Sequence, residues 1–174
     1  MAYLAQRYSL NKLSVICCKS LSDILNCENA CEILKTSIWL DKEKLKRDCK
    51  NLIAENTDFC FKTKSFLESD RRTIKEILSL DSMTIREVEV FKHIMKWARN
   101  KILQRNNDKT LRDIVGDGIH LIRFPTMTNS EFAKHVIPYE VLVECEQLDI
   151  FRAIGDDQFH AIGFIHEPRR LIEK

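Results

Sequence analysis

The chain has 174 residues, of which 44% are hydrophobic and 31% are charged. A length of this order predicts a single domain with a hydrophobic core. The 28 basic and 26 acidic residues give a net charge of +2, which excludes a partner recognised through bulk charge alone, such as nucleic acid or a membrane surface.

The first residues reach Arg7 before a long apolar run develops, so we expect no secretory signal. No stretch approaches the roughly 18 apolar residues that a membrane-spanning helix needs. The seven cysteines are an odd number. Without a secretory signal, they are predicted to be reduced thiols in a cytoplasmic or nuclear protein.

Glycine and proline are confined to the last third of the chain. All four glycines and all three prolines lie at or after Gly116. Glycine supplies the positive φ angles of tight turns, and β-rich folds use many such turns. Residues 1–115 are therefore predicted to form helices joined by short polar corners, with no glycine-rich loop for phosphate.

In the first half, apolar residues recur at steps of three and four. This spacing predicts amphipathic helices over residues 9–25 and 28–40. Asp41 is expected to cap a third helix, which runs to about residue 53, and a weaker helical segment follows over residues 59–67. Asp70 is expected to cap the next helix.

The second half begins with a helix-start signal. Thr84 and Glu87 have the spacing of a capping box, which predicts the start of the longest helix, running to about residue 104. A polar break follows at residues 106–108. The next helix is expected to run from about residue 109 through two glycines and to end at Pro125.

Thr128 and Glu131 form a second capping box, which predicts a short helix that Pro138 ends. A last helix is expected over about residues 139–154. Arg123 is expected to cap the carbonyl groups of the helix that precedes it. The helical pattern stops after about residue 154. The predicted fold class is therefore all-α: an array of antiparallel helical hairpins with a short non-helical C-terminal extension.

Few residues indicate a reaction centre. The spacing of Cys27 and Cys31 is compatible with zinc, but Cys31 continues a helical apolar face and no paired histidines follow. We therefore expect no metal and no cofactor. No nucleophile-elbow, zinc-protease or Walker-type motif occurs, so catalysis is not expected. An enzyme with a reactive cysteine, paired in space with one of the five histidines, is left as an alternative.

Aromatic residues and one basic stretch are given structural roles. Trp39, Trp97 and the phenylalanines at 59, 61 and 66 lie on or beside helical stripes, so they are predicted to be in the core. Residues 42–50 carry five basic side chains interleaved with acidic ones. A solvated helix face is expected there rather than contacts to phosphates.

Apolar side chains also gather near the N-terminus, at Tyr3, Leu4, Tyr8, Leu10 and Leu13. Exposed apolar patches mark partner contacts. A preceding domain or a partner helix is therefore expected to cover these residues.

The order of several segments resembles the BACK domain, which follows BTB/POZ domains in BTB adaptors of the kelch-like type. The resemblance covers about residues 3–151. The segments that carry it are NACEIL at 29–34, LKRDC at 45–49, SFL at 65–67, EVEVF at 87–91 and LIRFPTM at 121–127.

In that family, the BACK domain is an array of helical hairpins that links a dimeric BTB domain to a substrate-recruiting module. The resemblance implies that residues 1–40 form the first, 3-box-like hairpins, residues 41–154 the remainder of the BACK helical domain, and residues 155–174 an extension or linker to a further module. It also implies that dimerisation rests on a BTB domain, which lies outside these residues.

The family's 3-box helps the BTB domain to hold the N-terminal region of Cullin-3. The resemblance thus implies a non-catalytic adaptor segment of a cullin-RING ubiquitin ligase, serving a substrate protein that the sequence does not identify. A transcriptional or cytoskeletal interaction scaffold unconnected with ubiquitin is the alternative. A partner-facing role is expected of Tyr8, Lys12, Leu13 and Ile16. The alternative for Leu13 and Ile16 is that they pack inside the hairpin.

Overall fold

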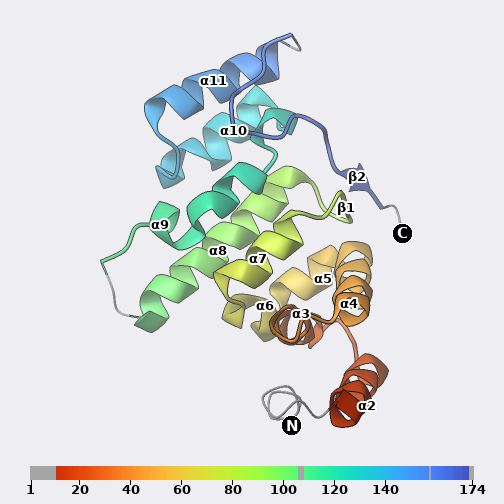
Figure 1. Cartoon of the computed structure of the whole chain (residues 1–174). Coiled ribbons are helices and arrows are strands. Elements are labelled where there is room, and N and C mark those ends of the chain that lie inside the picture. Colours follow the sequence, from red (N-terminus) through yellow and green to blue (C-terminus); the bar gives the residue numbers. More distant parts are fainter. Residues whose placement is uncertain (1–10, 106–107, 157, 173–174) are drawn as a thin grey trace.

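The structure is a computed structural model that describes residues 11–105, 108–156 and 158–172, without the side chains of residues 11–14 and 105. Within these residues the chain is helical, as predicted (Figure 1). The α-helices, in chain order, are α2 (Asn11–Asp23), α3 (Ala30–Trp39), α4 (Glu43–Glu55), α5 (Thr57–Lys62), α6 (Lys64–Glu68), α7 (Arg71–Leu78), α8 (Glu87–Arg105), α9 (Leu111–Val115), α10 (Asn129–His135) and α11 (Glu144–Gly155).

Short elements connect some of these helices. Three 3-10 helices are η1 (Gly116–Leu121), η2 (Phe124–Thr126) and η3 (Ile137–Tyr139). Two short strands, β1 (Ser82–Met83) and β2 (Arg170–Leu171), pair in parallel, with Ser82 opposite Arg170.

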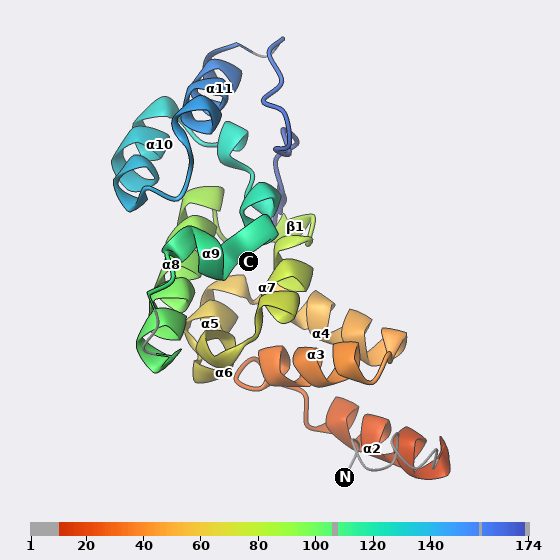
Figure 2. The same cartoon turned by 60° about the vertical axis from the view of Figure 1, so that its left-hand side comes forward.

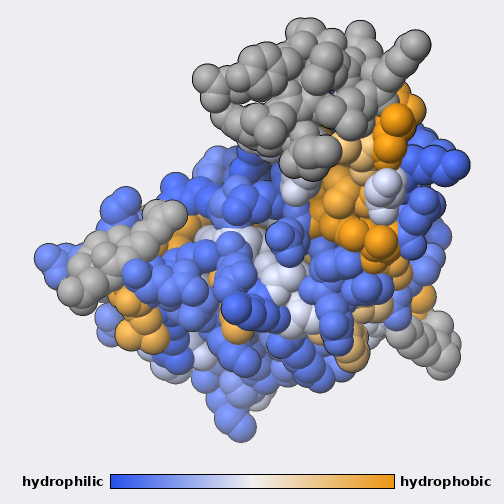
Figure 3. All heavy atoms as spheres, turned by 90° about the horizontal axis from the view of Figure 1, so that it is seen from below, coloured by the Kyte–Doolittle hydropathy of each residue, from blue (hydrophilic) through white to orange (hydrophobic). Residues whose placement is uncertain are grey.

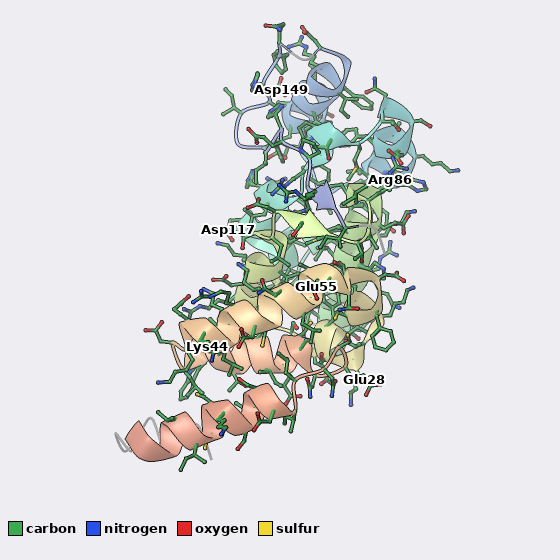
Figure 4. The ribbon with its side chains drawn as sticks, turned by 90° about the vertical axis from the view of Figure 1, so that its right-hand side faces the viewer. Glu28, Lys44, Glu55, Arg86, Asp117 and Asp149 are labelled. Atoms are coloured by element: carbon green, nitrogen blue, oxygen red, sulfur yellow. The ribbon has the colours of Figure 1, made fainter. Side chains whose placement is uncertain are left out.

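The helices form an elongated stack. Figures 1 and 2 show α2 at one end, α3 and α4 next to it, α8 through the middle, and α10 and α11 at the other end. The labelled Glu28 and Asp149 mark these two ends in Figure 4. Contacts between elements that are not consecutive, such as α3 with α6 and α6 with α8, hold the stack together.

Corners without glycine join the first helices. Between α2 and α3, the Asn26 side chain accepts a hydrogen bond from the Glu28 N–H at 2.9 Å, and the Asn29 side chain accepts one from the Asn26 N–H at 2.8 Å. After α3, Asp41 adopts a φ of 54°, a left-handed conformation that aspartate tolerates better than most residues. The prediction of polar corners is confirmed, but the predicted capping role of Asp41 is wrong, because α4 starts at Glu43 after Lys42.

Two predicted caps are confirmed. The Asp70 side chain accepts a hydrogen bond from the Thr73 N–H at 2.8 Å at the start of α7. At the start of α10, Thr128 and Glu131 form the reciprocal bonds of a capping box. Both caps act within one turn, which is why the local sequence is sufficient to predict them.

The predicted capping box at Thr84 is wrong. Helix α8 starts at Glu87 itself, so Glu87 is not the third residue of the helix. The Thr84 N–H instead donates to the hydroxyl of Thr57 at 3.3 Å, and the Glu87 carboxylate pairs with Arg169. Arg169, which is 82 residues away in sequence, thus binds the Glu87 carboxylate that was predicted to bond at the helix start.

Near a glycine and a proline, one predicted helix ends early and another starts late. Gly116 has a φ of 59°, and a Cβ added there would lie 2.8 Å from the Arg71 guanidinium, so α9 stops at Val115 and the chain continues as a 3-10 helix. The last helix starts at Glu144 rather than near 139, because the Pro138 turn is followed by a left-handed residue, Glu140.

The core runs along the stack and centres on α8. Trp97 is 1% exposed, and its indole N–H donates to the Ser69 carbonyl at 2.9 Å. Phe61 and Phe66 are buried and stacked, with ring centroids 4.4 Å apart. These three residues confirm the core prediction.

Two other predicted core aromatics are on the surface. Trp39 is 48% exposed at the end of α3, and Phe59 is 54% exposed on α5. Trp39 is the last residue of α3 and directly follows the buried Ile38. The sequence alone did not determine which of the two faced inward.

The C-terminal extension is non-helical, as predicted, and it folds back onto the helices. Figure 1 shows it running alongside α11 and then down to β1. The Arg170 N–H donates to the Asp81 carbonyl at 2.8 Å, and the Ile172 N–H donates to the Met83 carbonyl at 2.9 Å. The segment after α11 is thereby attached to the middle of the stack.

Candidate interaction surface

Helix α2 carries an exposed apolar face at the N-terminal end of the stack. Val15 is 67% exposed and Ile16 is 61% exposed, and Ile24, just after the helix, is 58% exposed. Seen from this end, hydrophobic residues gather at the position of α2 (Figure 3). Contiguous exposed apolar side chains mark interaction sites.

Only part of α2 touches the rest of the molecule. Leu21, Leu25 and Cys27 are partly buried against the core, and α2 packs on α4. Asn29 donates from its side-chain amide to the Ile24 carbonyl at 2.8 Å, which fixes the corner into α3. Among the described side chains of α2, Leu21 packs against the core, whereas Val15 and Ile16 are exposed.

The structure describes the side chain of only one of the four predicted partner-facing residues. Tyr8 lies outside the described residues, and Lys12 and Leu13 are described only as backbone of the first turn of α2. Ile16 is on α2 with its side chain exposed, so it does not pack inside the hairpin. Its role in partner binding stays a prediction, as do those of the other three.

The buried cysteines are poorly suited to nucleophilic chemistry. Burial raises the pKa of Cys31 to about 12 and that of Cys49 to about 12, and burial also raises the pKa of Cys60. A thiol with such a pKa is protonated near neutral pH, whereas the thiolate is the reactive form. Over residues 11–105, 108–156 and 158–172, no group of three or more His, Cys, Asp or Glu side chains is arranged to hold a metal ion.

A buried ionic network joins α8 to the C-terminal extension. Arg169 pairs with Glu87 at 2.9 Å, with side chains 2% and 7% exposed, and it also donates to the carbonyls of Leu80 and Leu121. The Glu87 carboxylate accepts a further bond from the Arg123 N–H at 2.9 Å. Such a pair is maintained because every polar group in it has a partner.

Arg123 does not cap the helix before it, so that prediction is wrong. Its guanidinium donates to the Asp81 carboxylate at 2.6 Å and to the Glu167 carbonyl at 2.8 Å. It therefore bridges the end of α7 and the C-terminal extension. The sequence signals a buried role for neither Arg123 nor Arg169, because their partners are 36 to 89 residues away.

The basic stretch at residues 42–50 is partly paired rather than simply solvated. Lys46 and Lys50 both reach Glu76 on α7, at 2.9 and 3.3 Å.

In the part of the chain that the structure describes, no helix is long and apolar enough to span a membrane.

Comparison with known proteins gives one family. Residues 30–137 match the family described as BACK, BTB And C-terminal Kelch. The chain is 27% identical to human BTB/POZ domain-containing protein 6 over 152 residues, which cover 86% of this chain and 28% of that protein. It is 28% identical to BTB/POZ domain-containing protein 3 of Mus musculus over 171 residues, which cover 97% and 32%.

A zebrafish relative, BTB/POZ domain-containing protein 6-B of Danio rerio, is 29% identical over 152 residues, which cover 86% of this chain and 32% of that protein. The chain thus spans less than a third of the length of these relatives. No solved structure matches it.

Proposed function

Because this chain belongs to the BACK family, an adaptor family, we propose that it is a non-catalytic segment of a cullin-RING ubiquitin-ligase adaptor. In this role it acts together with a BTB domain, adds to that domain's contact with the N-terminal region of Cullin-3, and positions a module that recruits a substrate protein. The exposed apolar face of α2 is the observation that carries the proposal.

The arrangement of α2 supports a supplementary contact. Val15 is 67% exposed and Ile16 is 61% exposed on this helix, so a partner surface has access to both. Two aliphatic side chains bury little surface, which suits an addition to a larger BTB interface rather than an independent one. The names of the relatives place a BTB/POZ domain in those proteins.

The C-terminal extension supports the positioning role. Its attachment through Arg169 and through the β1–β2 pairing fixes the direction in which the chain leaves the helical stack. A module joined there would hold a constant orientation relative to the cullin-binding end. The reduced cysteines suit the cytoplasm or nucleus, where we propose that the protein works.

The proposal is tested by titrating the N-terminal region of Cullin-3 into the BTB-containing full-length protein and its variants. Ile16→Asp should weaken binding by about tenfold, because it places a charge in an apolar contact. Leu103→Asp is the matched control, since Leu103 is 80% exposed on α8, away from α2. It should bind like the unchanged protein.

Equal affinity of the unchanged protein and Ile16→Asp would contradict the role of α2. No measurable Cullin-3 binding by the unchanged protein would favour the alternative of an interaction scaffold unconnected with ubiquitin. Circular dichroism of both variants keeps loss of folding separate from loss of binding. Deletion of residues 1–40 is a poorer test, because it removes the buried Ile33 and Leu34 of α3.

A further inference from the structure

Helix α7 and the 3-10 helix η1 form a basic hollow on the side of the stack. The hollow has a volume of about 600 Å³ and is lined by Arg71, Arg72, Lys75, Glu76 and Asp117, among others. Lys46 and Lys50 of the neighbouring α4 both contact Glu76, so their charges lie beside the hollow. Asp117 marks this face in Figure 4, on the same side of the molecule as Lys44.

The positive charges here exceed the negative ones. Lys46 contacts both Glu43, at 3.8 Å, and Glu76, which Lys50 also contacts, and Lys75 pairs with Asp117 at 2.5 Å. Arg72 adds a further exposed cation close enough to Lys46 to act on it electrostatically. The carboxylates within the hollow therefore leave part of this positive charge available to a ligand.

The Arg71 guanidinium is already bonded to backbone carbonyls, so we do not count it among the cations that a ligand would contact. Its guanidinium donates to the Ile114 carbonyl at 2.9 Å and to the Asp113 carbonyl, at the end of α9. It also lies directly against Gly116, whose missing side chain leaves the space. This contact fixes the start of α7, the helix from which Arg72 and Lys75 project.

An apolar recess adjoins the basic hollow. Arg72 lines both. The recess is also lined by Lys35, Ile38 and Trp39 of α3 and by two carboxylates, those of Glu32 and Asp70. Its volume is about 330 Å³, and Trp39 is 48% exposed at its edge. Tryptophan next to arginine is a frequent composition at the centre of protein interfaces.

From this juxtaposition we propose that the α4–α7 face binds an acidic segment of a protein partner. Carboxylates of the segment lie over Lys46, Lys50, Arg72 and Lys75, and an apolar side chain of the segment occupies the recess beside Trp39. This site is separate from α2, so it goes beyond the proposed contact with Cullin-3.

The fixed carboxylates favour a peptide over nucleic acid. Glu76 and Asp117 lie among the cations and would repel a continuous phosphate backbone. A peptide can place its carboxylates with gaps and can fill the recess with an aliphatic side chain. The net charge of +2 also gives the whole chain little general attraction for polyanions.

Fluorescence anisotropy with a labelled glutamate-rich peptide containing one leucine tests the proposal on the 174-residue chain. The peptide should bind at low salt, and its glutamine counterpart should not. The site variant combines Lys50→Gln, Arg72→Gln and Lys75→Gln. It should bind about tenfold more weakly, because three modest charge interactions are removed.

The matched control combines Lys62→Gln, Lys64→Gln and Lys134→Gln, which removes the same charge from exposed positions outside the hollow. It should change the affinity by less than about twofold. The single reversal Arg72→Glu gives a second readout if the triple variant does not fold.

Three results would overturn the proposal. One is no binding of the glutamate-rich peptide by the unchanged chain. Another is equal weakening in the site and control variants, which would mean general charge attraction. The third is tighter binding of a single-stranded oligonucleotide than of the peptide with the same dependence on Arg72, which would assign the hollow to nucleic acid. None of these results depends on whether Cullin-3 binds α2.

Discussion

At the scale of single residues, Trp97 connects three parts of the fold. It projects from α8, is 1% exposed, and donates to the Ser69 carbonyl between α6 and α7. Truncation leaves a large cavity and an unpaired carbonyl group. Trp97→Ala should therefore lower the free energy of unfolding by about 3–5 kcal/mol in a urea titration.

Trp39→Ala is the natural comparison, because Trp39 is the same residue type with a 48% exposed side chain. Its cost should stay below about 1 kcal/mol. Similar losses in the two variants would mean that the assignment of these side chains to core and surface is wrong.

The Glu87–Arg169 pair gives a second prediction at this scale. Glu87→Gln leaves a buried guanidinium without its counter-charge, and the expected loss of unfolding free energy is about 3–5 kcal/mol. Asp58→Asn breaks the exposed Lys62–Asp58 pair and should cost less than about 1 kcal/mol. A mild effect of Glu87→Gln would show that the C-terminal extension does not depend on this pair.

At the scale of elements, some helix starts are capped by residues of the same turn, and at others the expected capping residue makes a tertiary contact instead. Thr128 caps α10 through its own turn, whereas Thr84 contacts Thr57 and Asp58 instead of the start of α8. Thr128→Ala should cost about 1 kcal/mol in thermal or urea unfolding. Thr84→Ala should cost no more than about half as much, because it removes only the long, 3.4 Å bond from the Asp58 N–H in the first turn of α5.

An ion pair between α9 and α11 makes stability depend on pH. The Arg112 guanidinium donates to both Glu146 carboxylate oxygens, at 2.6 and 2.8 Å. Partial burial acts to raise the pKa of Glu146, but the hydrogen bonds from Arg112 and from the Val143 N–H outweigh it, and the pKa lies below its usual 4.5. The carboxylate thus stabilises the fold when it is ionised.

This stabilisation is present above about pH 4.5 and is lost as the pH falls through the lower folded-state pKa. Unfolding measured from roughly pH 5 to 3 should therefore show a smaller loss of stability in Glu146→Gln than in the unchanged chain. Glu144→Gln, at an exposed position of the same helix, should keep the original pH dependence. Identical profiles for all three proteins would exclude this contribution.

At the scale of the whole molecule, the periodic apolar pattern was sufficient to predict the helical class and most helices. Polar corners were predictable in general because the first 115 residues contain no glycine, and Asn26 and Asn29 form one of them through local hydrogen bonds. The pairing of Glu87 with Arg169 was not, because it depends on how the extension folds back over α8. For the candidate surface, the sequence indicated the first hairpin, while the exposure of Ile16 required the structure.

The proposed function requires that these stacked helices add to the contact of a BTB domain with Cullin-3. The most direct measurement is calorimetric titration of the N-terminal region of Cullin-3 against a BTB domain alone and against the same domain joined to this chain. We predict that the joined form binds about tenfold more tightly. Equal dissociation constants for the two forms would contradict the account.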